Sequence, residues 1–187
     1  MKNIFLIIIL SLILFSCGEK EEAEEETTTE LEGTWKSACY TESDNYSFYT
    51  TPTFAGNVLT ITDEKHSDTS CATDYRLEEE SHTISIGSGV TFTSGNTGHY
   101  FTITVGSISQ ITPQSASAVS AFNSSSECGY NSGWELNTVK NCSNDDAGDT
   151  DYCLYLLDGN YLYPDCDDSS YPSSIDTSDT SKTLVKQ

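Results

Sequence analysis

Apolar and polar residues alternate in short runs from Gly33 onward. The clearest run is 101–105, in which three apolar residues share one face and two threonines share the other. The same alternation appears in residues 58–62, 84–86 and 90–93. A period of two residues is typical of strands that are buried on one face and solvated on the other. The pattern therefore predicts an antiparallel β-sheet.

Turn residues separate these runs, and one pair predicts a β-hairpin. Asp158-Gly159 stands between the apolar segments 152–157 and 160–163. Asp-Gly favours a type I′ turn, because both central residues of that turn need a positive φ. We therefore expect these two segments to pair as neighbouring strands.

One short helix is expected in the second half of the chain. Thr112 is a suitable N-cap, and Pro113 fits the first helical position, where its missing N–H costs nothing. The serine run 124–126 marks the end of this helix. Its apolar face consists of Ala116, Val119 and Phe122.

These elements predict an all-β fold class. We expect an antiparallel barrel or sandwich of about 8–10 strands with one short helix. The domain is expected to span residues 31–166. Residues 167–187 are rich in Ser, Thr and Asp, with 183–185 as a candidate last edge strand.

The N-terminus carries a separate apolar segment. Residues 4–15 are apolar except Ser11, and Lys2 precedes them. A membrane-spanning helix needs about 18 or more apolar residues, so this run fits a signal peptide better. The following Ser16-Cys17 could then be the site of cleavage.

The four residues Leu14-Phe15-Ser16-Cys17 resemble the lipobox of bacterial lipoproteins. The resemblance implies a signal peptide at 1–16, cleavage before Cys17, and lipid, including palmitate, on the Cys17 sulfur. More than one acyl chain would make the membrane anchor durable. The alternative is a plain secretory signal that is cut elsewhere.

Residues 17–30 form an acidic segment, since eight of residues 19–32 are glutamate. Such a block repels itself and is expected to be a disordered tether. Acidic residues after the cysteine also resemble export signals of some surface lipoproteins. Gly18 after the cysteine resembles the pattern of outer-membrane lipoproteins, so we expect a lipid-anchored protein of the cell envelope, at the outer membrane.

The charge balance restricts the partners. The chain carries a formal net charge of −21, with 29 acidic and 8 basic residues. Nucleic-acid binding needs clustered Lys and Arg, so a nucleic-acid partner is excluded. Attraction to anionic lipid is excluded for the same reason, which leaves the anchor on Cys17 as the contact with the membrane.

The cysteine count predicts disulfides. With Cys17 lipidated, six cysteines remain, and an even number in an exported chain indicates three disulfides. Six cysteines allow 15 pairings. We expect pairing in sequence order, with each bridge contributing about 3 kcal/mol to stability. The expected bridges are Cys39–Cys71, Cys128–Cys142 and Cys153–Cys166.

The segment Leu31-Glu32-Gly33-Thr34-Trp35 resembles the first strand of lipocalin-like (calycin) barrels. In that family Gly-x-Trp opens the barrel, so the resemblance implies that Gly33 and Trp35 form its floor. The hairpin at 155–163 resembles the closing hairpins of small bacterial lipocalin-like lipoproteins. The basic residue that packs over this tryptophan in the family has no evident counterpart, because Arg76, the only arginine, comes too early. An ordinary core aromatic is the alternative for Trp35.

Candidate chemistry is sparse. No nucleophile motif is present, the histidines do not fall at zinc-ligand spacing from the cysteines, and we expect neither an enzyme nor a cofactor. The run 78–80 of three glutamates is expected to be a solvated turn. A second acidic cluster supplies weak Ca²⁺ candidates, because Ca²⁺ prefers carboxylate oxygens. These candidates are Asp145, Asp146, Asp149 and Asp151.

Two functions follow from these features. The first is a lipid-anchored, non-catalytic barrel that binds a small apolar ligand, with Tyr155, Tyr161 and Tyr163 as candidate lining residues because tyrosine combines apolar area with a polar tip. The alternative is a surface-exposed structural or interaction lipoprotein with a filled core and no ligand, whose partner is a surface protein.

Overall fold

The computed structural model describes residues 29–41, 45–92 and 95–187. The predicted signal peptide, Cys17 and residues 18–28 of the acidic segment lie outside this range. In chain order the elements are β1 (Gly33–Ser37), β2 (Tyr40–Thr41), β3 (Ser47–Ala55), β4 (Val58–His66), β5 (Asp74–Thr91), β6 (Thr97–Thr104), β7 (Ile108–Pro113), α2 (Ala116–Ser125), the 3₁₀ turn η1 (Glu127–Gly129), β8 (Lys140–Ser143), β9 (Thr150–Asp158), β10 (Tyr161–Asp167) and β11 (Leu184–Lys186).

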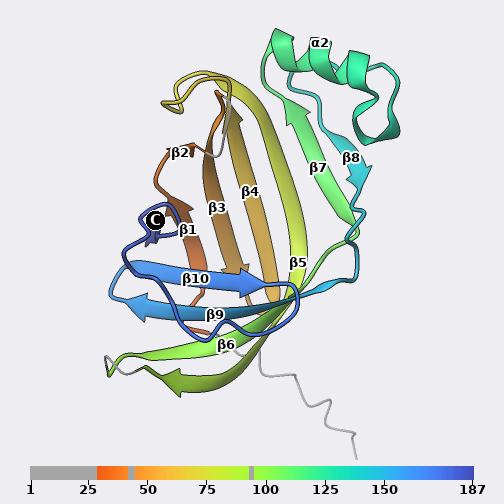
Figure 1. Ribbon diagram of the computed structural model, residues 1–187. Helices are drawn as coiled ribbons and strands as arrows, with labels where there is room; N and C mark the ends of the chain where they lie inside the picture. The colour runs from red at the N-terminus through yellow and green to blue at the C-terminus, as the bar shows by residue number, and fades with distance from the viewer. Residues whose placement is uncertain (1–28, 42–44, 93–94) are drawn as a thin grey trace, which may run out of the picture.

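Eight of these strands close into an antiparallel barrel (Figure 1). The ring runs β3-β1-β11-β10-β9-β6-β5-β4, and β4 pairs with β3 again to complete it. The predicted all-β class is confirmed, as a barrel rather than a sandwich. The hairpin between β9 and β10 at Asp158-Gly159 is also confirmed, because Tyr161 pairs with Asp158.

The long strand β5 belongs to two parts of the sheet. One edge pairs with β4 over the first half of the strand, from Asp74 to Thr83, whereas the other edge pairs first with β7 and then with β6. Consequently β7, β8 and α2 form an extension beside the barrel (Figure 1). The extension has its own small core of buried residues, which are Ile111, Ala118, Phe122, Trp134 and Cys142.

The helix of this extension starts later than the sequence predicts. Its N-cap is Ser115, whose side chain accepts a hydrogen bond from the Ala118 amide at 3.2 Å. Thr112 and Pro113 instead end β7, where Pro113 pairs opposite Arg76 of β5. Pairing with β5 therefore overrides the capping signal of Thr112. The buried face contains Phe122, as expected, and Ala118, whereas Ala116 is exposed and Val119 is half-buried.

The last strand is not an edge strand, contrary to expectation. β11 pairs with β1 on one side and with β10 on the other, so it completes the wall of the barrel. Leu184 is buried in the barrel core because it pairs opposite Leu162. The domain therefore extends beyond residue 166 to include β11.

Three disulfides pair the cysteines in sequence order, as expected. Cys39–Cys71 joins the segment after β1 to the loop between β4 and β5. The other two bridges are Cys128–Cys142, inside the extension, and Cys153–Cys166, across the hairpin of β9 and β10.

Trp35 is buried at one end of the barrel. Only 1% of the residue is exposed, and its indole N–H donates to the Leu31 carbonyl at 2.8 Å. The Lys186 ammonium lies 5.1 Å from the centre of the indole. The expectation that no basic residue near the end of the chain covers this tryptophan is therefore wrong: pairing of β1 with β11 places Lys186 directly opposite Trp35.

Candidate ligand-binding site

An apolar cavity of about 150 Å³ lies inside the barrel. Because side chains alternate along a strand, every second residue points inward, and in an eight-stranded barrel these residues enclose a space for one small ligand. The surface exposed to this space is apolar. Its wall includes Leu59, Ile61, Phe101, Ile103, Tyr155 and Leu162.

Tyr155 brings one polar atom to this wall and is itself almost fully buried. Its hydroxyl donates to Glu30 Oε1 at 2.7 Å, and its ring packs edge-on against Phe101. Burial raises the pKa of Tyr155, and the contact with Glu30 raises it further. The same hydrogen bond lowers the pKa of Glu30. The phenol is therefore neutral, and its hydroxyl is already satisfied without a ligand.

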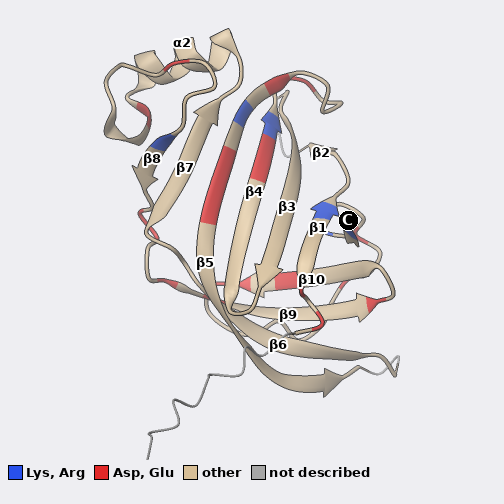
Figure 2. Ribbon diagram, turned by 180° about the vertical axis from the view of Figure 1, so that it is seen from behind, with Lys and Arg blue, Asp and Glu red and all other residues tan. Residues whose placement is uncertain are grey.

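A larger cavity of about 790 Å³ carries carboxylates and is called the acidic cavity here. Figure 2 shows acidic residues on β5, one of the strands that line this cavity. Four segments of the chain contribute carboxylates to its wall. They are Glu80 of β5, Asp146 and Asp149 of the loop before β9, Asp151 of β9 and Asp168 after β10.

The two cavities adjoin each other. Ile61 and Ile103 line both of them, so the two cavities lie side by side and share a wall at these two side chains. A third hollow of about 490 Å³ adjoins the apolar cavity at Thr50, Pro164 and Leu184. A bound molecule in the apolar cavity would therefore have the acidic cavity as its neighbour on the side of Ile61 and Ile103.

Burial and mutual repulsion change the titration of the acidic cavity. Burial raises the pKa of Glu80, and the nearby Glu78 and Asp63 raise it further. Burial also raises the pKa of Asp151, and repulsion from the Asp168 carboxylate is the next largest cause of this rise. Both shifts mean that negative charge in this cavity is unfavourable without a cation close by.

His82 is a neutral hydrogen-bond donor in the acidic cavity. Burial lowers its pKa, and its Nδ1 accepts a hydrogen bond from the Gly106 amide at 3.2 Å. The proton of the neutral ring therefore sits on Nε2, which has no hydrogen-bond partner and lies 3.5 Å from Glu80 Oε2. Glycine is required at 106, because a Cβ there would lie 1.9 Å from the Ser81 carbonyl oxygen.

The predicted lining tyrosines separate onto two faces. Tyr155 of β9 lines the apolar cavity. Tyr161 and Tyr163 of β10 do not, because Leu162 between them points inward, and alternation turns its neighbours outward. Tyr161 is 48% exposed, and its ring packs against that of Tyr163 on the outer surface.

The Ca²⁺ candidates lie around the acidic cavity without forming a metal site. Asp146, Asp149 and Asp151 line the cavity, whereas Asp145 does not. In the described part of the chain, no three carboxylate, imidazole or thiol groups converge at metal-binding distance. The carboxylates instead spread over a wall large enough for an organic group.

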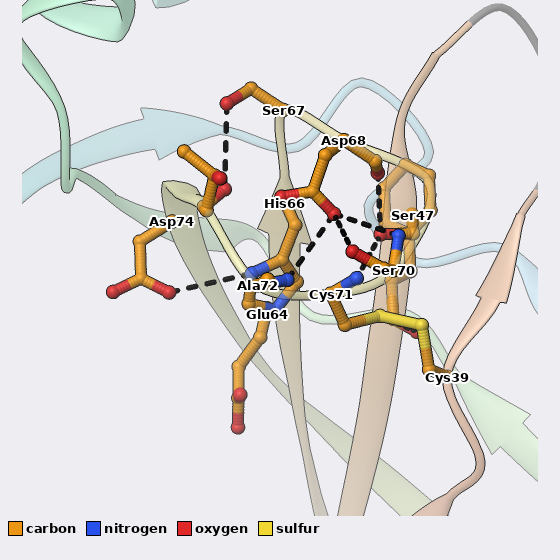
Figure 3. Close-up of polar contacts among 12 residues, drawn as sticks. Cys39, Ser47, Glu64, His66, Ser67, Asp68, Ser70, Cys71, Ala72 and Asp74 are labelled. Atoms are coloured by element: carbon orange, nitrogen blue, oxygen red, sulfur yellow. Dashed lines mark hydrogen bonds and ion pairs between the residues drawn. A yellow bond between two sulfur atoms is a disulfide. The ribbon is translucent and has the colours of Figure 1, made fainter.

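A second histidine, His66, is buried beneath the loop between β4 and β5 (Figure 3). Its Nδ1 lies 3.4 Å from an oxygen of Asp74, but neither ring nitrogen has a hydrogen-bond partner. The nearby Ser47 hydroxyl donates to the Asp68 carbonyl and accepts from the Cys71 amide. Ser47 thus ties β3 to the loop and is not hydrogen-bonded to His66 as a nucleophile would be.

Asp68 holds the same loop in shape (Figure 3). Its Oδ1 accepts hydrogen bonds from the amides of Ser70 and Ala72, at 2.7 and 3.2 Å. A side-chain hydrogen bond from Thr73, together with the Ser70 amide, holds the pKa of Asp68 well below its usual range. This cluster, with the Cys39–Cys71 bridge, stabilises the loop and contains no cavity-lining residue.

Sequence reasoning did not assign two polar residues of β5, Glu80 and His82, to a site, although both line the acidic cavity. The run 78–80 is not a solvated turn, because all three glutamates lie in the middle of β5. Its alternation continues that of the strand, since Glu80 and His82 share the inward face with Ile84. That alternation was the signal that could have found Glu80 and His82.

Comparison with known proteins assigns no family to this chain. A scan against protein-family models finds no match, and a search of curated proteins finds no significant relative. Within the residues that the structure describes, no helix is both long and apolar enough to cross a membrane.

Proposed function

We propose that this protein is a lipid-anchored, lipocalin-like barrel of the bacterial cell envelope that binds a small apolar ligand inside the barrel. The observation that carries this function is the apolar cavity, which is enclosed by the ring of strands and exposes no polar surface. A mostly apolar, preformed cavity is the usual form of a small-molecule site.

The first strand supports the lipocalin-like part of the proposal. Gly33-x-Trp35 opens this strand, and the tryptophan is buried in the core of the barrel. Lys186 packs over its ring from the last strand, in the way that a basic residue covers the corresponding tryptophan in the family that the sequence resembles.

The volume of the apolar cavity limits the ligand. An engineered protein cavity of about 150 Å³ lined by Leu, Ile and Phe holds one benzene molecule. The apolar cavity here has the same volume, about 150 Å³, and a similar lining. The ligand group that enters it is therefore one ring or a short alkyl chain, rather than a long acyl chain.

Filling the cavity from its wall should abolish binding. Ile61 is half-buried and lines the cavity, so Ile61→Trp places an indole in the space for the ligand. We expect the affinity for 1-hexanol, measured by titration calorimetry, to fall about tenfold or more in a variant that stays folded, since added bulk in a core costs about 1–3 kcal/mol.

The matched control for this variant is Val58→Trp on the same strand. Val58 is 41% exposed and lies on the outer face, so the same added bulk stays outside the barrel. Equal hexanol affinity in both variants and in the wild type, or no saturable binding to the wild type, would refute a ligand site inside the barrel.

The anchor makes a separate prediction. Cys17→Ser should leave an unprocessed precursor that incorporates no radiolabelled palmitate, because the lipid is attached to the Cys17 sulfur. Cys39→Ser, which removes a cysteine of a disulfide, should still incorporate the label. Undiminished labelling of the Cys17 variant would show that the segment 14–17 is not a lipobox.

The alternative function is a surface interaction protein, and one observation favours it. The extension exposes several large apolar side chains, namely Ile108, Leu136 and Val139, which are 49%, 50% and 53% exposed. This function would leave the barrel without a ligand. An absence of saturable hexanol binding would therefore favour it.

A further inference from the structure

The acidic cavity offers a charged environment beside an apolar one. Ile61 and Ile103 line both cavities, so the two lie side by side. A molecule whose apolar part fills the smaller cavity would reach past these two side chains to place its other end in the larger cavity. The chemistry of the acidic cavity then decides what that end is.

No basic side chain neutralises this cavity among the described residues. Five carboxylates line it, and its lining includes neither Lys nor Arg. Basic residues found in ion pairs lie elsewhere: Lys36 pairs with Glu64, Arg76 with Glu78 and Lys182 with Asp165. The two best-buried carboxylates of this cavity, Glu80 and Asp151, are therefore each repelled by neighbouring carboxylates, without a lysine or arginine in the cavity wall to offset the repulsion.

The buried imidazole adds an independent feature that points to a ligand. The His82 side chain is only 5% exposed, it lines the acidic cavity, and its Nε2 has no hydrogen-bond partner. A buried donor without a partner costs about 1–3 kcal/mol, so such groups normally face a ligand or water. The ring is neutral and does not repel a cation, and its N–H suits an uncharged acceptor oxygen beside the charge.

We propose that the ligand is an amphipathic organic cation, with an ammonium group in the acidic cavity between Glu80 and Asp151, and a ring or short alkyl chain in the apolar cavity. This inference rests on the proposed function and names its ligand class. The ammonium replaces the missing fixed cation and relieves the repulsion among the carboxylates. A carboxylic acid with the same tail would bring a sixth negative charge into the cavity, so fatty acids are excluded.

Three probes with one tail and different charges test this proposal: hexylamine, 1-hexanol and hexanoate. Titration calorimetry with the purified protein at low ionic strength should give hexylamine the lowest Kd. We expect it to bind at least about tenfold more tightly than 1-hexanol, with hexanoate weakest, because opposite charges attract strongly where water is partly excluded. The advantage of the amine should shrink as salt is added.

Two isosteric variants locate the charge. Glu80→Gln combined with Asp151→Asn should remove most of the preference for hexylamine and leave the affinity for 1-hexanol unchanged. The control is Glu79→Gln, which removes one negative charge from the neighbouring position on the outer, exposed face of β5. This control should keep the full preference for the amine.

The outcomes separate the two proposals. Equal binding of hexylamine and 1-hexanol would overturn the cation and leave the apolar ligand site in place. A preference that survives in the Glu80 and Asp151 variant would also overturn it, because the charge would then be recognised elsewhere. Saturable binding of none of the three probes would overturn the proposed function itself.

Discussion

Replacing Trp35 with alanine is expected to lower the free energy of unfolding by about 3–5 kcal/mol, the usual cost of truncating a buried tryptophan. The residue is 1% exposed, and its indole N–H donates to the Leu31 carbonyl at 2.8 Å. Leu31 is itself fully buried and lines the apolar cavity. The substitution therefore removes the indole and also loosens the wall residue that it holds. The measurement is the denaturant midpoint, followed by circular dichroism.

Trp35→Phe provides the matched control. This variant keeps an aromatic ring in the core but leaves the Leu31 carbonyl without its donor, at a cost of about 1–3 kcal/mol. We expect its midpoint to lie between those of the wild type and Trp35→Ala. If Trp35→Ala unfolds at the wild-type midpoint, Trp35 does not stabilise the barrel and the floor interpretation is wrong.

The second large effect concerns the Cys39–Cys71 bridge. Its cysteines are 32 residues apart, the widest separation of the three bridges. In the chain-entropy model, a loop of this length contributes roughly 3–4 kcal/mol by restricting the unfolded chain. Replacing both cysteines with alanine should lower the free energy of unfolding by that amount. Replacing Cys128 and Cys142 together, with a separation of 14, should cost about 3 kcal/mol.

Thiol counting checks all three bridges at once. Alkylation of the purified protein should modify no cysteine before reduction and six after it, since Cys17 is expected to carry lipid on its sulfur. Two or more thiols that react before reduction would contradict the three disulfides. Seven alkylated cysteines after reduction would still agree with three disulfides in the native protein, but would refute lipidation at Cys17.

Local patterns predicted the wall of the barrel well. Alternation located β4 and β6, Asp158-Gly159 located the hairpin of β9 and β10, and sequence proximity ordered the disulfides. Each of these signals acts between residues close in the chain. The predicted start of the helix was wrong because Thr112 and Pro113 pair with β5, a strand that is distant in the sequence, instead of beginning the helix.

The acidic cavity could not be predicted in the same way. Asp146, Asp149 and Asp151 stand together in the sequence, but Glu80 and His82 come from β5 and Asp168 follows β10. Only closure of the ring brings these segments together. Similarly, the inward direction of Tyr155 and the outward direction of Tyr161 depend on strand register, which the turn alone did not reveal.

The pairing of Trp35 with Lys186 also affects how the chain folds. It joins the first barrel strand to the last, so the ring cannot close until nearly all of the described chain is available. Topologies with such high contact order fold slowly, because loop entropy is lost before long-range contacts compensate for it. All three disulfides link cysteines that are consecutive in the described chain and can form before this closure. Early oxidation would then shorten the search for the last pairing and the time during which Trp35 is exposed to aggregation.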